Sequence, residues 1–354
     1  MTPVGSTLSW AELNRAVLAR QLLLERVALD PAAAVERVGG LQTQYAPSAY
    51  VGLWSRLVDF HRADLTSALV DGRVVQAWVM RCTIHMVSAA DYWPLTEAVR
   101  EQRRGWFLRS PRGLTEADMT AAADVVAKRL ADGPAKQAEL VAALVAAGFD
   151  KAVFQGVQLW LDLVRVPPAG TWELPRAHVY GLAAQHVPAE PVERAAAEEL
   201  LVRRYLGGFG PATPSDVARY AGWNITETRA VLGRIELRAD RDPDGAELLD
   251  LPDAVRPDGE TPAPVRFLST FDALLLLGHA KRARVLPDEH REKVFATKMP
   301  QSIPTFLVDG HVAGTWRYLD GRVVPTPFTP LSRAAGRAVD DEAERLTAFH
   351  TADR

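Results

Sequence analysis

The sequence predicts an α+β protein built from several small units, at least two of which are winged helices. The 354 residues suffice for two or three domains, or for more if they are small. Two segments repeat the order helix, glycine-containing turn, helix and β-hairpin, which is the order of a winged helix. Proline clusters separate such segments, because proline is disfavoured inside helices and central strands. They lie at 167–168, 188–191, 257–264 and 325–330.

The first repeat begins near residue 136. Apolar residues at helical spacing predict helices over 136–146 and 151–163, with Gly148 in the turn between them. Residues 165–174 then predict a strand, a turn and a second strand.

The second repeat has the clearer local signals. We expect Thr213 to cap a helix that ends at Gly222, and Thr226 to cap the next helix. Strands over 235–239 and 247–251 follow, joined by an Asp-Pro-Asp-Gly turn, so this segment also predicts a hairpin.

The two ends of the chain contribute further elements. Near the N-terminus, helices are predicted over 11–26 and from Asp30-Pro31 onward, and Gly39-Gly40 ends the second one. Towards the C-terminus, residues 306–318 predict a hairpin around an Asp-Gly turn. The region 265–328 is therefore expected to form a small closed or nearly closed sheet.

The charge is distributed unevenly along the chain. The net charge of −3 gives no overall sign of a polyanionic partner. Residues 73–112 nevertheless carry +4 and residues 278–299 carry +3, whereas residues 236–260 carry −6. This pattern fits a polyanion that touches part of the surface, and it equally fits solvated faces that vary in charge. In the first case, 236–260 should lie away from the nucleic acid.

Composition and missing motifs exclude several classes of protein. The single Cys82 rules out an intrachain disulfide framework and a multi-cysteine zinc site. There is no HExxH, P-loop or GxSxG motif, so the common metalloprotease, nucleotide-hydrolase and serine-hydrolase functions lack support. No apolar run approaches the ~20 residues of a membrane span, and the start does not resemble a signal peptide. We expect a cytoplasmic protein without metal or cofactor.

The first candidate for chemistry is the segment Gly39-Gly40-Leu41-Gln42-Thr43-Gln44. If it is extended, the Gln42 and Gln44 side chains project to the same side, and both amides can reach one point. Amides can orient a water molecule or a sugar oxygen without carrying charge. Taken alone, such a pair more often caps a helix end or faces solvent.

Two further segments carry polar residues in suggestive order. Arg81 to Val87 looks like a strand in which Arg81, Thr83 and His85 share one face, with Cys82 opposite and packed in the core. A histidine in a strand is more often a satisfied polar residue than a functional one. In the segment 269–284, Asp272 and the stretch from His279 onward can either meet phosphates or form internal salt bridges.

Taken together, these motifs resemble the AlkZ-like winged-helix DNA glycosylases over nearly the whole chain, about residues 13–328. The matching segments, in chain order, are Leu13-Asn14-Arg15, Leu18 to Leu24, Gly39 to Gln44, Arg81 to His85, Phe271-Asp272, His279 with Arg282, and Phe306 to Trp316. The most specific of them is the pair of glutamines after the double glycine.

The resemblance implies a fold, with the following expected boundaries. It implies three tandem winged helices in a C-shaped arrangement with a small C-terminal β-barrel. The expected divisions are an N-terminal winged-helix region with the Gln-Thr-Gln motif (1–113), a second winged helix (114–190), a third (191–262), the barrel (263–330) and a tail (331–354).

The resemblance also implies an activity, a substrate and a set of residues. Gln42 and Gln44 match the catalytic pair of the two-glutamine branch, although Thr43 replaces the usual bulky apolar residue. The implied activity is base excision repair of alkylated purines in double-stranded DNA, including interstrand crosslinks formed at N7, by a monomeric enzyme without lyase activity. The expected DNA contacts are Arg81, Thr83, His85, Lys281, Arg282, His311 and Arg317.

Two other functions fit the sequence. A non-catalytic winged-helix protein, such as a transcription regulator, explains the repeats and the basic segments but gives Gln42 and Gln44 no role. A scaffold whose winged helices bind protein suits the acidic segment. Loss of base release after substitution of both glutamines would distinguish an enzyme from a non-catalytic DNA-binding protein. A steep salt dependence of DNA binding would distinguish a DNA-binding protein from a protein-binding scaffold.

Overall fold

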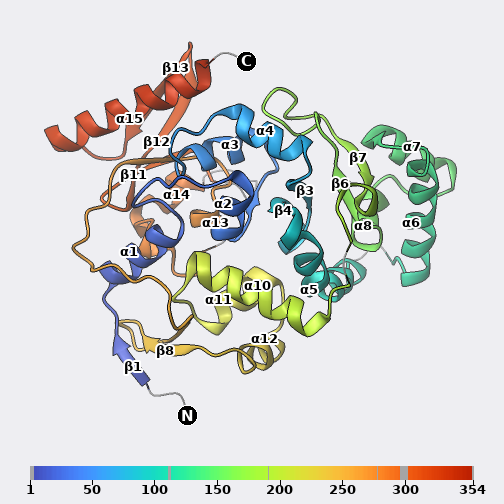
Figure 1. Ribbon diagram of the computed structural model, residues 1–354, viewed down its shortest axis with the longest axis horizontal. Helices are drawn as coiled ribbons and strands as arrows, with labels where there is room; N and C mark the ends of the chain where they lie inside the picture. The colour runs from blue at the N-terminus through green and yellow to red at the C-terminus, as the bar shows by residue number, and fades with distance from the viewer. Residues whose placement is uncertain (1–3, 111–112, 190, 277, 296–301, 353–354) are drawn as a thin grey trace.

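A computed structural model of the chain describes residues 4–110, 113–189, 191–276, 278–295 and 302–352. Helices and strands are mixed along these residues, which confirms the predicted α+β class (Figure 1). Arg112, Leu277 and Lys298 contributed to the sequence predictions and lie outside the described residues. Within those residues, no helix is both long enough and apolar enough to span a bilayer.

The N-terminal part is mainly helical. Its elements are β1 (Val4–Thr7), α1 (Trp10–Arg20), α2 (Pro31–Arg37), β2 (Leu41–Gln42), α3 (Pro47–Trp54), α4 (Arg62–Val70), β3 (Val74–Trp78), the 3₁₀ turn η1 (Met80–Cys82), β4 (Ile84–Ser88) and α5 (Ala89–Leu108). Helix α2 begins where predicted, because Asp30 caps it and Pro31 occupies its first turn.

Helix α1 is shorter than predicted. It ends at Arg20, because Leu22 adopts a left-handed φ of 57° and the buried Gln21 side chain turns away to other segments. The amide Nε2 of Gln21 donates to the carbonyl oxygens of Val38 at 3.0 Å and Gly208 at 2.9 Å. These hydrogen bonds connect the end of α1 to the end of α2 and to Gly208, in helix α10 (Arg194–Phe209).

The second unit contains the predicted helix–turn–helix with a hairpin. Its elements are α6 (Glu116–Leu130), β5 (Ala135–Lys136), α7 (Gln137–Ala146), α8 (Val153–Trp160), β6 (Leu163–Arg165), β7 (Val179–Leu182) and α9 (Ala183–His186). The return strand of the hairpin is 179–182, so the second strand predicted within 165–174 is wrong. Tyr180 explains why 179–182 forms this strand: its buried ring packs edge-on against Phe154 of α8, with the ring centroids 5.6 Å apart.

One six-stranded sheet joins the first two units. Its strand order is β2-β4-β3-β6-β7-β5, and every pairing in it is antiparallel. The joint is between β3 and β6, where Gln76 pairs with Arg165 and Ala77 with Val164. Strand β2, which carries Gln42, therefore lies at one edge of a sheet whose other edge belongs to the second unit.

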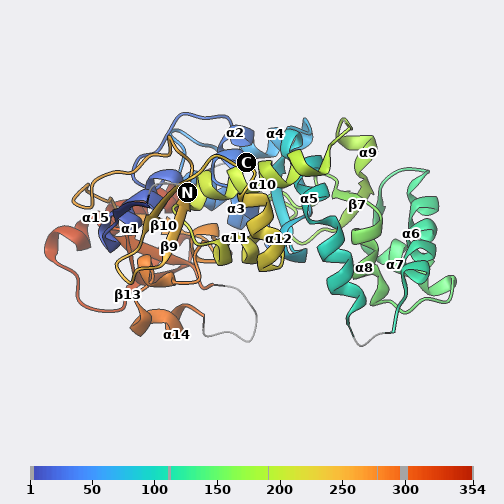
Figure 2. The same cartoon turned by 90° about the horizontal axis from the view of Figure 1, so that it is seen from below.

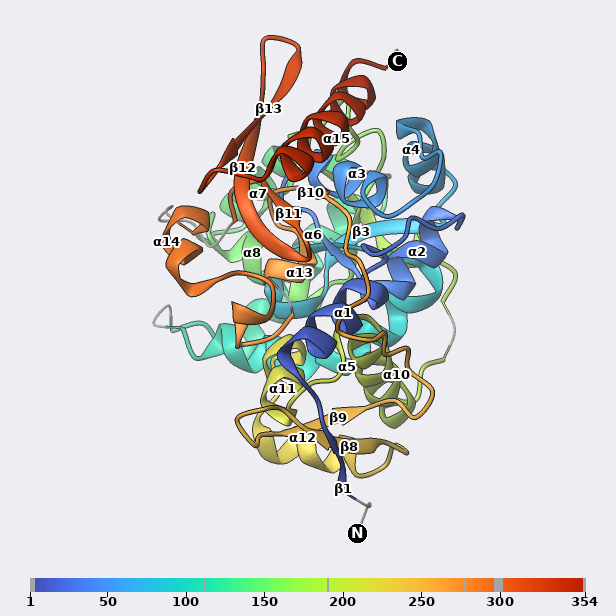
Figure 3. The ribbon, with the colours of Figure 1, turned by 90° about the vertical axis from the view of Figure 1, so that its left-hand side faces the viewer.

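The third unit repeats the helix–turn–helix and hairpin. It consists of α10 (Arg194–Phe209), α11 (Pro214–Ala221), α12 (Ile225–Leu232), β8 (Arg238–Arg241) and β9 (Glu247–Asp250). Thr213 and Asp216 form a capping box at α11, and Gly222 ends that helix in the left-handed region, as predicted. Asn224, not Thr226, caps α12. The N-terminal β1 adds to the hairpin in parallel with β8 (Figure 3).

The C-terminal part forms an open sheet covered by a helix. It contains β10 (Arg266–Leu268), α13 (Ala273–Leu276), η2 (Arg282–Arg284), η3 (Asp288–His290), α14 (Arg291–Val294), β11 (Thr305–Val308), β12 (His311–Leu319), β13 (Arg322–Pro327) and α15 (Arg333–Thr351). The strand order is β10-β11-β12-β13, and no pairing among the described residues closes it into a barrel.

The segment expected as a tail contains α15. Its apolar residues Val339, Ala343, Leu346 and Phe349 recur at helical spacing and are buried. The helix packs along β13 and β10, at the top of the molecule in Figure 3. It therefore belongs to the core of the C-terminal part.

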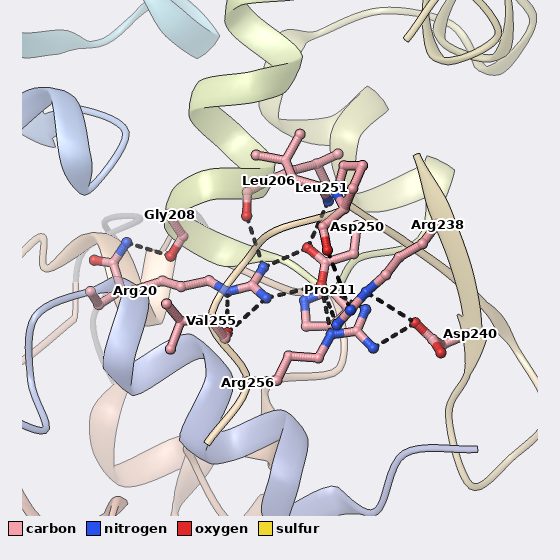
Figure 4. A network of polar contacts seen from close by, with 12 residues as sticks. Arg20, Leu206, Gly208, Pro211, Arg238, Asp240, Asp250, Leu251, Val255 and Arg256 are labelled. Atoms are coloured by element: carbon pink, nitrogen blue, oxygen red, sulfur yellow. Dashed lines mark hydrogen bonds and ion pairs between the residues drawn. The ribbon is translucent and has the colours of Figure 1, made fainter. Parts of the chain in front are cut away.

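A buried ionic network holds α1 to the third unit (Figure 4). The Asp250 carboxylate at the end of β9 accepts hydrogen bonds from Arg20 Nη1 at 2.7 Å and Nη2 at 2.9 Å. It also accepts from Arg256 Nε at 2.8 Å and Nη2 at 2.7 Å. Arg20 further donates to the carbonyl oxygens of Leu206 and Val255. With Arg238 Nη2 at 3.8 Å, three cations share one fully buried carboxylate, while carbonyl groups satisfy the remaining donors of Arg20.

Figure 2 shows how the parts are arranged. The α14 segment and the far end of α5 project on the same side of the molecule, with α11 and α12 between them. The α6–α8 unit lies at one end and the C-terminal sheet at the other.

Candidate active site

The glutamine motif is held by a tight turn beside α11. Gly39 and Gly40 have left-handed φ values of 77° and 86°, and a Cβ at Gly40 would lie 3.1 Å from Met80 Cε. The Tyr220 hydroxyl of α11 donates to the Gly39 carbonyl at 2.7 Å. The double glycine therefore lets β2 start close to both η1 and the third unit.

Gln42 lies directly opposite His85 in the sheet. The pairing of β2 with β4 places Leu41 against Met86 and Gln42 against His85, and the Thr43 amide donates to the Ile84 carbonyl at 2.8 Å. Directly opposed residues of antiparallel strands project to the same face. The Gln42 amide and the His85 imidazole are therefore neighbours.

His85 is a buried, neutral imidazole. Its side chain has no exposed surface, and burial lowers its pKa to about 4. Nδ1 lies 2.9 Å from the Thr83 carbonyl oxygen, which places the proton on Nδ1 and leaves Nε2 as an acceptor. His85 thus has no exposed surface and lies against Gln42, a surrounding that does not favour its predicted role as a DNA contact, which stays a prediction.

The burial of His85 and His279 predicts a stability that falls in acid. The pKa of each is lowered to about 4, so below pH 6.5 the unfolded chain takes up protons that the folded one does not. The free energy of unfolding should fall between pH 6.5 and 4, by about 3 kcal/mol for each histidine. Urea denaturation at several pH values measures this. His85→Leu should make the slope shallower by one proton, and His61→Leu, at an exposed position, should not; equal slopes for both variants and the wild type would contradict the assignment.

Several buried polar atoms of the segment 42–48 and of β4 have no hydrogen-bond partner in the described part of the chain. Among the described residues, no hydrogen-bond partner exists for five buried atoms, namely Gln42 Oε1, Thr43 Oγ1, Gln44 Oε1, Ser48 Oγ and His85 Nε2. Buried polar atoms in proteins are nearly always paired, so these unpaired atoms make the segment a candidate for binding another hydrogen-bonding molecule.

The geometry departs from the predicted one at Gln44. Strand β2 ends at Gln42, and the chain bends at 44–45 before α3, so the extended segment assumed for both glutamines is shorter than expected. Gln44 is half-buried, and Thr43 between the two is fully buried. That both amides reach one point stays a prediction.

Arg81 and Thr83 do not continue the strand that carries His85. Arg81 and Cys82 both have left-handed φ values, 53° and 54°, and β4 begins only at Ile84. The single strand face predicted for Arg81, Thr83 and His85 is therefore wrong. Thr83 still contacts His85, with Oγ1 3.4 Å from Nδ1. Non-glycine residues in this region of φ cost energy and often occur at functional sites.

The other predicted DNA contacts differ in their surroundings. Lys281 pairs with Asp242 at 2.9 Å and with Asp244 at 2.7 Å. Its charge is therefore compensated by the acidic segment 236–260, which was expected to lie away from the nucleic acid. Arg282 is half-buried, donates from Nε to the Leu275 carbonyl at 2.9 Å and forms no ion pair with a described carboxylate.

His311 and Arg317 lie on the solvent face of β12. The alternate residues Val312, Gly314 and Trp316 are buried, so both predicted contacts are accessible, although roughly 20 Å of strand separates them. His311 is anchored by Nδ1 at 3.0 Å from the Asp309 carbonyl oxygen.

Asp272, His279 and Arg284 of the segment 269–284 are internal. Asp272 forms a buried two-point ion pair with Arg56, with both N–O distances at 3.0 Å. His279 and Arg284 are also buried, and His279 Nδ1 lies 3.6 Å from Asp216. The salt-bridge alternative therefore holds for Asp272.

Two further arginines were not predicted as site residues from the sequence. Arg103 of α5 was counted in a basic segment but not singled out, and Arg219 of α11 lies outside both basic segments. Arg219 lies three residues after Asp216 on a helix whose cap was correctly predicted. Residues three apart in a helix lie on the same face, so this spacing could have indicated that Arg219 lies beside Asp216.

Comparisons with known proteins agree with this arrangement. A family model described as "DNA glycosylase AlkZ-like" matches residues 35–349. The chain is 27% identical over 363 residues to an "Interstrand DNA cross-link repair glycosylase" of Streptomyces sahachiroi, covering 96% of this chain and 95% of that protein. The fold matches the solved structure of Streptomyces sahachiroi DNA glycosylase AlkZ with a TM-score of 0.81 at 23% identity, over 97% of this chain and 96% of that one. Because the family model spans most of its length, the chain belongs to the AlkZ-like DNA glycosylase family.

Proposed function

We propose that this chain hydrolyses the N-glycosidic bond of cationic N7-alkylated purines in double-stranded DNA, and that it unhooks interstrand crosslinks formed at N7. The observation that carries the proposal is the group of unpaired buried atoms at Gln42, Gln44 and His85, in a chain of the AlkZ-like family. The printed name of the Streptomyces relative, a cross-link repair glycosylase, supports the second part.

The residue types suit a leaving group that is already activated. An N7-alkylated purine carries a positive charge and departs without a strong general acid. The remaining tasks are to place water near C1′ and to stabilise the oxocarbenium-like sugar, which oriented dipoles can do. The carbonyl oxygens of Gln42 and Gln44 supply such dipoles as members of the two-glutamine branch.

His85 completes this site as a positioning residue. Its Nδ1 proton is held by the Thr83 carbonyl, so its Nε2 can accept a hydrogen bond from the Gln42 amide or from a water molecule. Because burial keeps it neutral at pH 7, it adds no charge that would repel a cationic purine. As an acceptor beside Gln42, His85 can orient the Gln42 amide without acting as a base.

The surroundings of Lys281 favour hydrolysis without a lyase step. A Schiff-base nucleophile needs an unprotonated amine, and hence a lowered pKa. Asp244 and Asp242 raise the pKa of Lys281 instead. We therefore propose a monofunctional enzyme that works as a monomer, and an attempt to trap a covalent DNA adduct with borohydride should yield none.

The remaining structural expectations belong to the same proposal. The helix–turn–helix and hairpin units around α7–α8 and α11–α12 act as winged helices, and the N-terminal part as a third. They are arranged as a C around DNA, with the C-terminal sheet in place of the barrel. Arg81, Thr83, Arg282, His311, Arg317 and, once it leaves its acidic partners, Lys281 are the proposed DNA contacts.

A base-release assay on defined lesions tests the proposed activity. We expect the purified protein to release 7-methylguanine from duplex DNA and to separate the strands of an N7-crosslinked duplex, while uracil and 8-oxoguanine remain bound in DNA. Release of uracil as fast as 7-methylguanine would overturn the restriction to cationic lesions. Binding of duplex DNA without release of any base would favour the non-catalytic DNA-binding protein.

A further inference from the structure

A small cavity lies between η1, α5 and the end of α11. Its volume is about 240 Å³, and Arg81, Gln102, Arg103, Trp106 and Arg109 line it together with the end of α11. Three guanidinium groups therefore line one cavity, whereas no carboxylate does so among the described residues. A cavity of this composition is suited to an anion.

Arg103 gives this cavity a buried cation with spare donors. Its side chain is only 4% exposed, and Nη1 donates to the carbonyl oxygens of Trp78 and, at 3.0 Å, Val79. Nε and Nη2 have no partner among the described residues. Buried charges are expensive unless they are paired, so this arrangement favours a bound anion.

Further guanidinium groups surround Arg81, at the mouth of the cavity. Arg81 Nη1 donates to the Leu276 carbonyl at 3.2 Å, and Arg219 Nη2 donates to the Gly278 carbonyl at 2.7 Å. Together with Arg282, which donates to Leu275, they converge on the end of α13. Their mutual repulsion adds to partial burial in lowering the pKa of Arg81 and of Arg282.

These cations have little competition for an incoming ligand. Neither Arg81 nor Arg282 has a carboxylate partner within the described residues, and Arg219 reaches only Asp216 at 3.6 Å. Asp216 already accepts from Thr213 and from the Ala280 amide. The carbonyl groups hold the guanidinium groups in place without neutralising them, which leaves their charge available.

The arginines lie beside the glutamine motif. Tyr220 follows Arg219 in α11 and binds the Gly39 carbonyl, three residues before Gln42. Met80, next to Arg81, packs against Gly40. A strand bound along the arginines therefore passes close to a nucleotide held at Gln42.

We propose that Arg81, Arg109 and Arg219 form a clamp for the DNA backbone phosphates flanking the nucleotide at Gln42, with the buried Arg103 adding positive charge to the wall of the cavity. The exposed ring of Trp106, 58% accessible, points to a nucleic acid as the ligand, because indole rings stack on bases and sugars and guanidinium groups bind phosphates. This inference rests on the proposed function for the identity of that nucleotide, but the clamp itself requires only DNA binding.

Binding measurements at several salt concentrations test the clamp. The probe is a duplex with a stable abasic-site analogue, and the variants are Arg81→Gln, Arg109→Gln and Arg219→Gln in the full chain. Each substitution should weaken binding about tenfold. It should also reduce the slope of log affinity against log salt concentration by about one. Arg337→Gln, an exposed position on α15, is the matched control and should change neither quantity.

The outcomes separate the clamp from the proposed activity. If the three variants bind with wild-type affinity and salt dependence, the clamp is wrong even if the wild type releases alkylated purines. If the wild type releases no base and the variants still lose affinity and salt dependence, the clamp stands and the proposed activity is wrong. Circular dichroism of each variant establishes folding, and Arg219→Lys, which keeps the charge, should recover part of the affinity lost in Arg219→Gln.

Discussion

The double substitution Gln42→Ala, Gln44→Ala should reduce the rate of 7-methylguanine release by at least about 100-fold. Oriented polar groups act on charge that develops in the transition state, so their loss lowers the rate constant more than it lowers affinity. Both side chains lack a partner in the described structure at their carbonyl oxygens, so truncation breaks no hydrogen bond made by those atoms. Single-turnover release from a defined duplex measures the effect.

Binding and a matched variant complete this experiment. Affinity for the same duplex should stay within about threefold of wild type, because the phosphate contacts lie elsewhere and dominate binding. Gln185→Ala, an exposed glutamine of α9, should release the base at the wild-type rate. A double variant that keeps the wild-type rate would remove Gln42 and Gln44 from the catalytic machinery.

Asp250→Ala should lower the free energy of unfolding by about 3–5 kcal/mol. Asp250 is fully buried and is the carboxylate shared by Arg20 and Arg256 (Figure 4). Its removal leaves Arg20, which is 2% exposed, without a counter-charge. Urea denaturation followed by circular dichroism measures the loss.

Two further variants sharpen this result. Asp253→Ala, three residues along the chain and exposed, should change stability by less than about 0.5 kcal/mol. The double variant Arg20→Met, Asp250→Leu should be more stable than Asp250→Ala, because it removes the unpaired charge together with its partner. If Asp250→Ala and Asp253→Ala were equally stable, the network would have no structural role.

Local signals in the sequence predicted individual elements well. The start of α2 at Asp30-Pro31 and the capping box and glycine of α11 follow from residues within a few positions of each other. Such signals act through the backbone of one turn, so no distant contact is needed to interpret them.

Pairings between distant segments were not predictable in this way. The joint between β3 and β6 brings Gln76 to Arg165, and only packing of the folded chain selects it. The strand at 179–182 was not predicted because Tyr180 is positioned by packing against Phe154 of α8, not by its neighbours in sequence.

For the site, the sequence identified residue types but not their environment. Arg81, Thr83 and His85 alternate in sequence as a strand would, yet two successive left-handed residues, Arg81 and Cys82, break the alternation. His85 is buried and neutral beside Gln42 because β2 joins the sheet at β4. A strand of only two residues is too short to be predicted from the sequence pattern.

The six-stranded sheet also determines which movements are available to the molecule. Gln42 and the α6–α8 unit belong to one hydrogen-bonded ladder that runs from β2 to β5, so a rotation of that unit would have to bend or break the ladder between β3 and β6. The third unit and the C-terminal sheet share no strand with it. Side-chain packing, together with the contacts of Gln21, Tyr220 and Asp250, holds these parts to the N-terminal one instead. Gln42 and the α6–α8 unit should therefore keep a fixed geometry relative to each other.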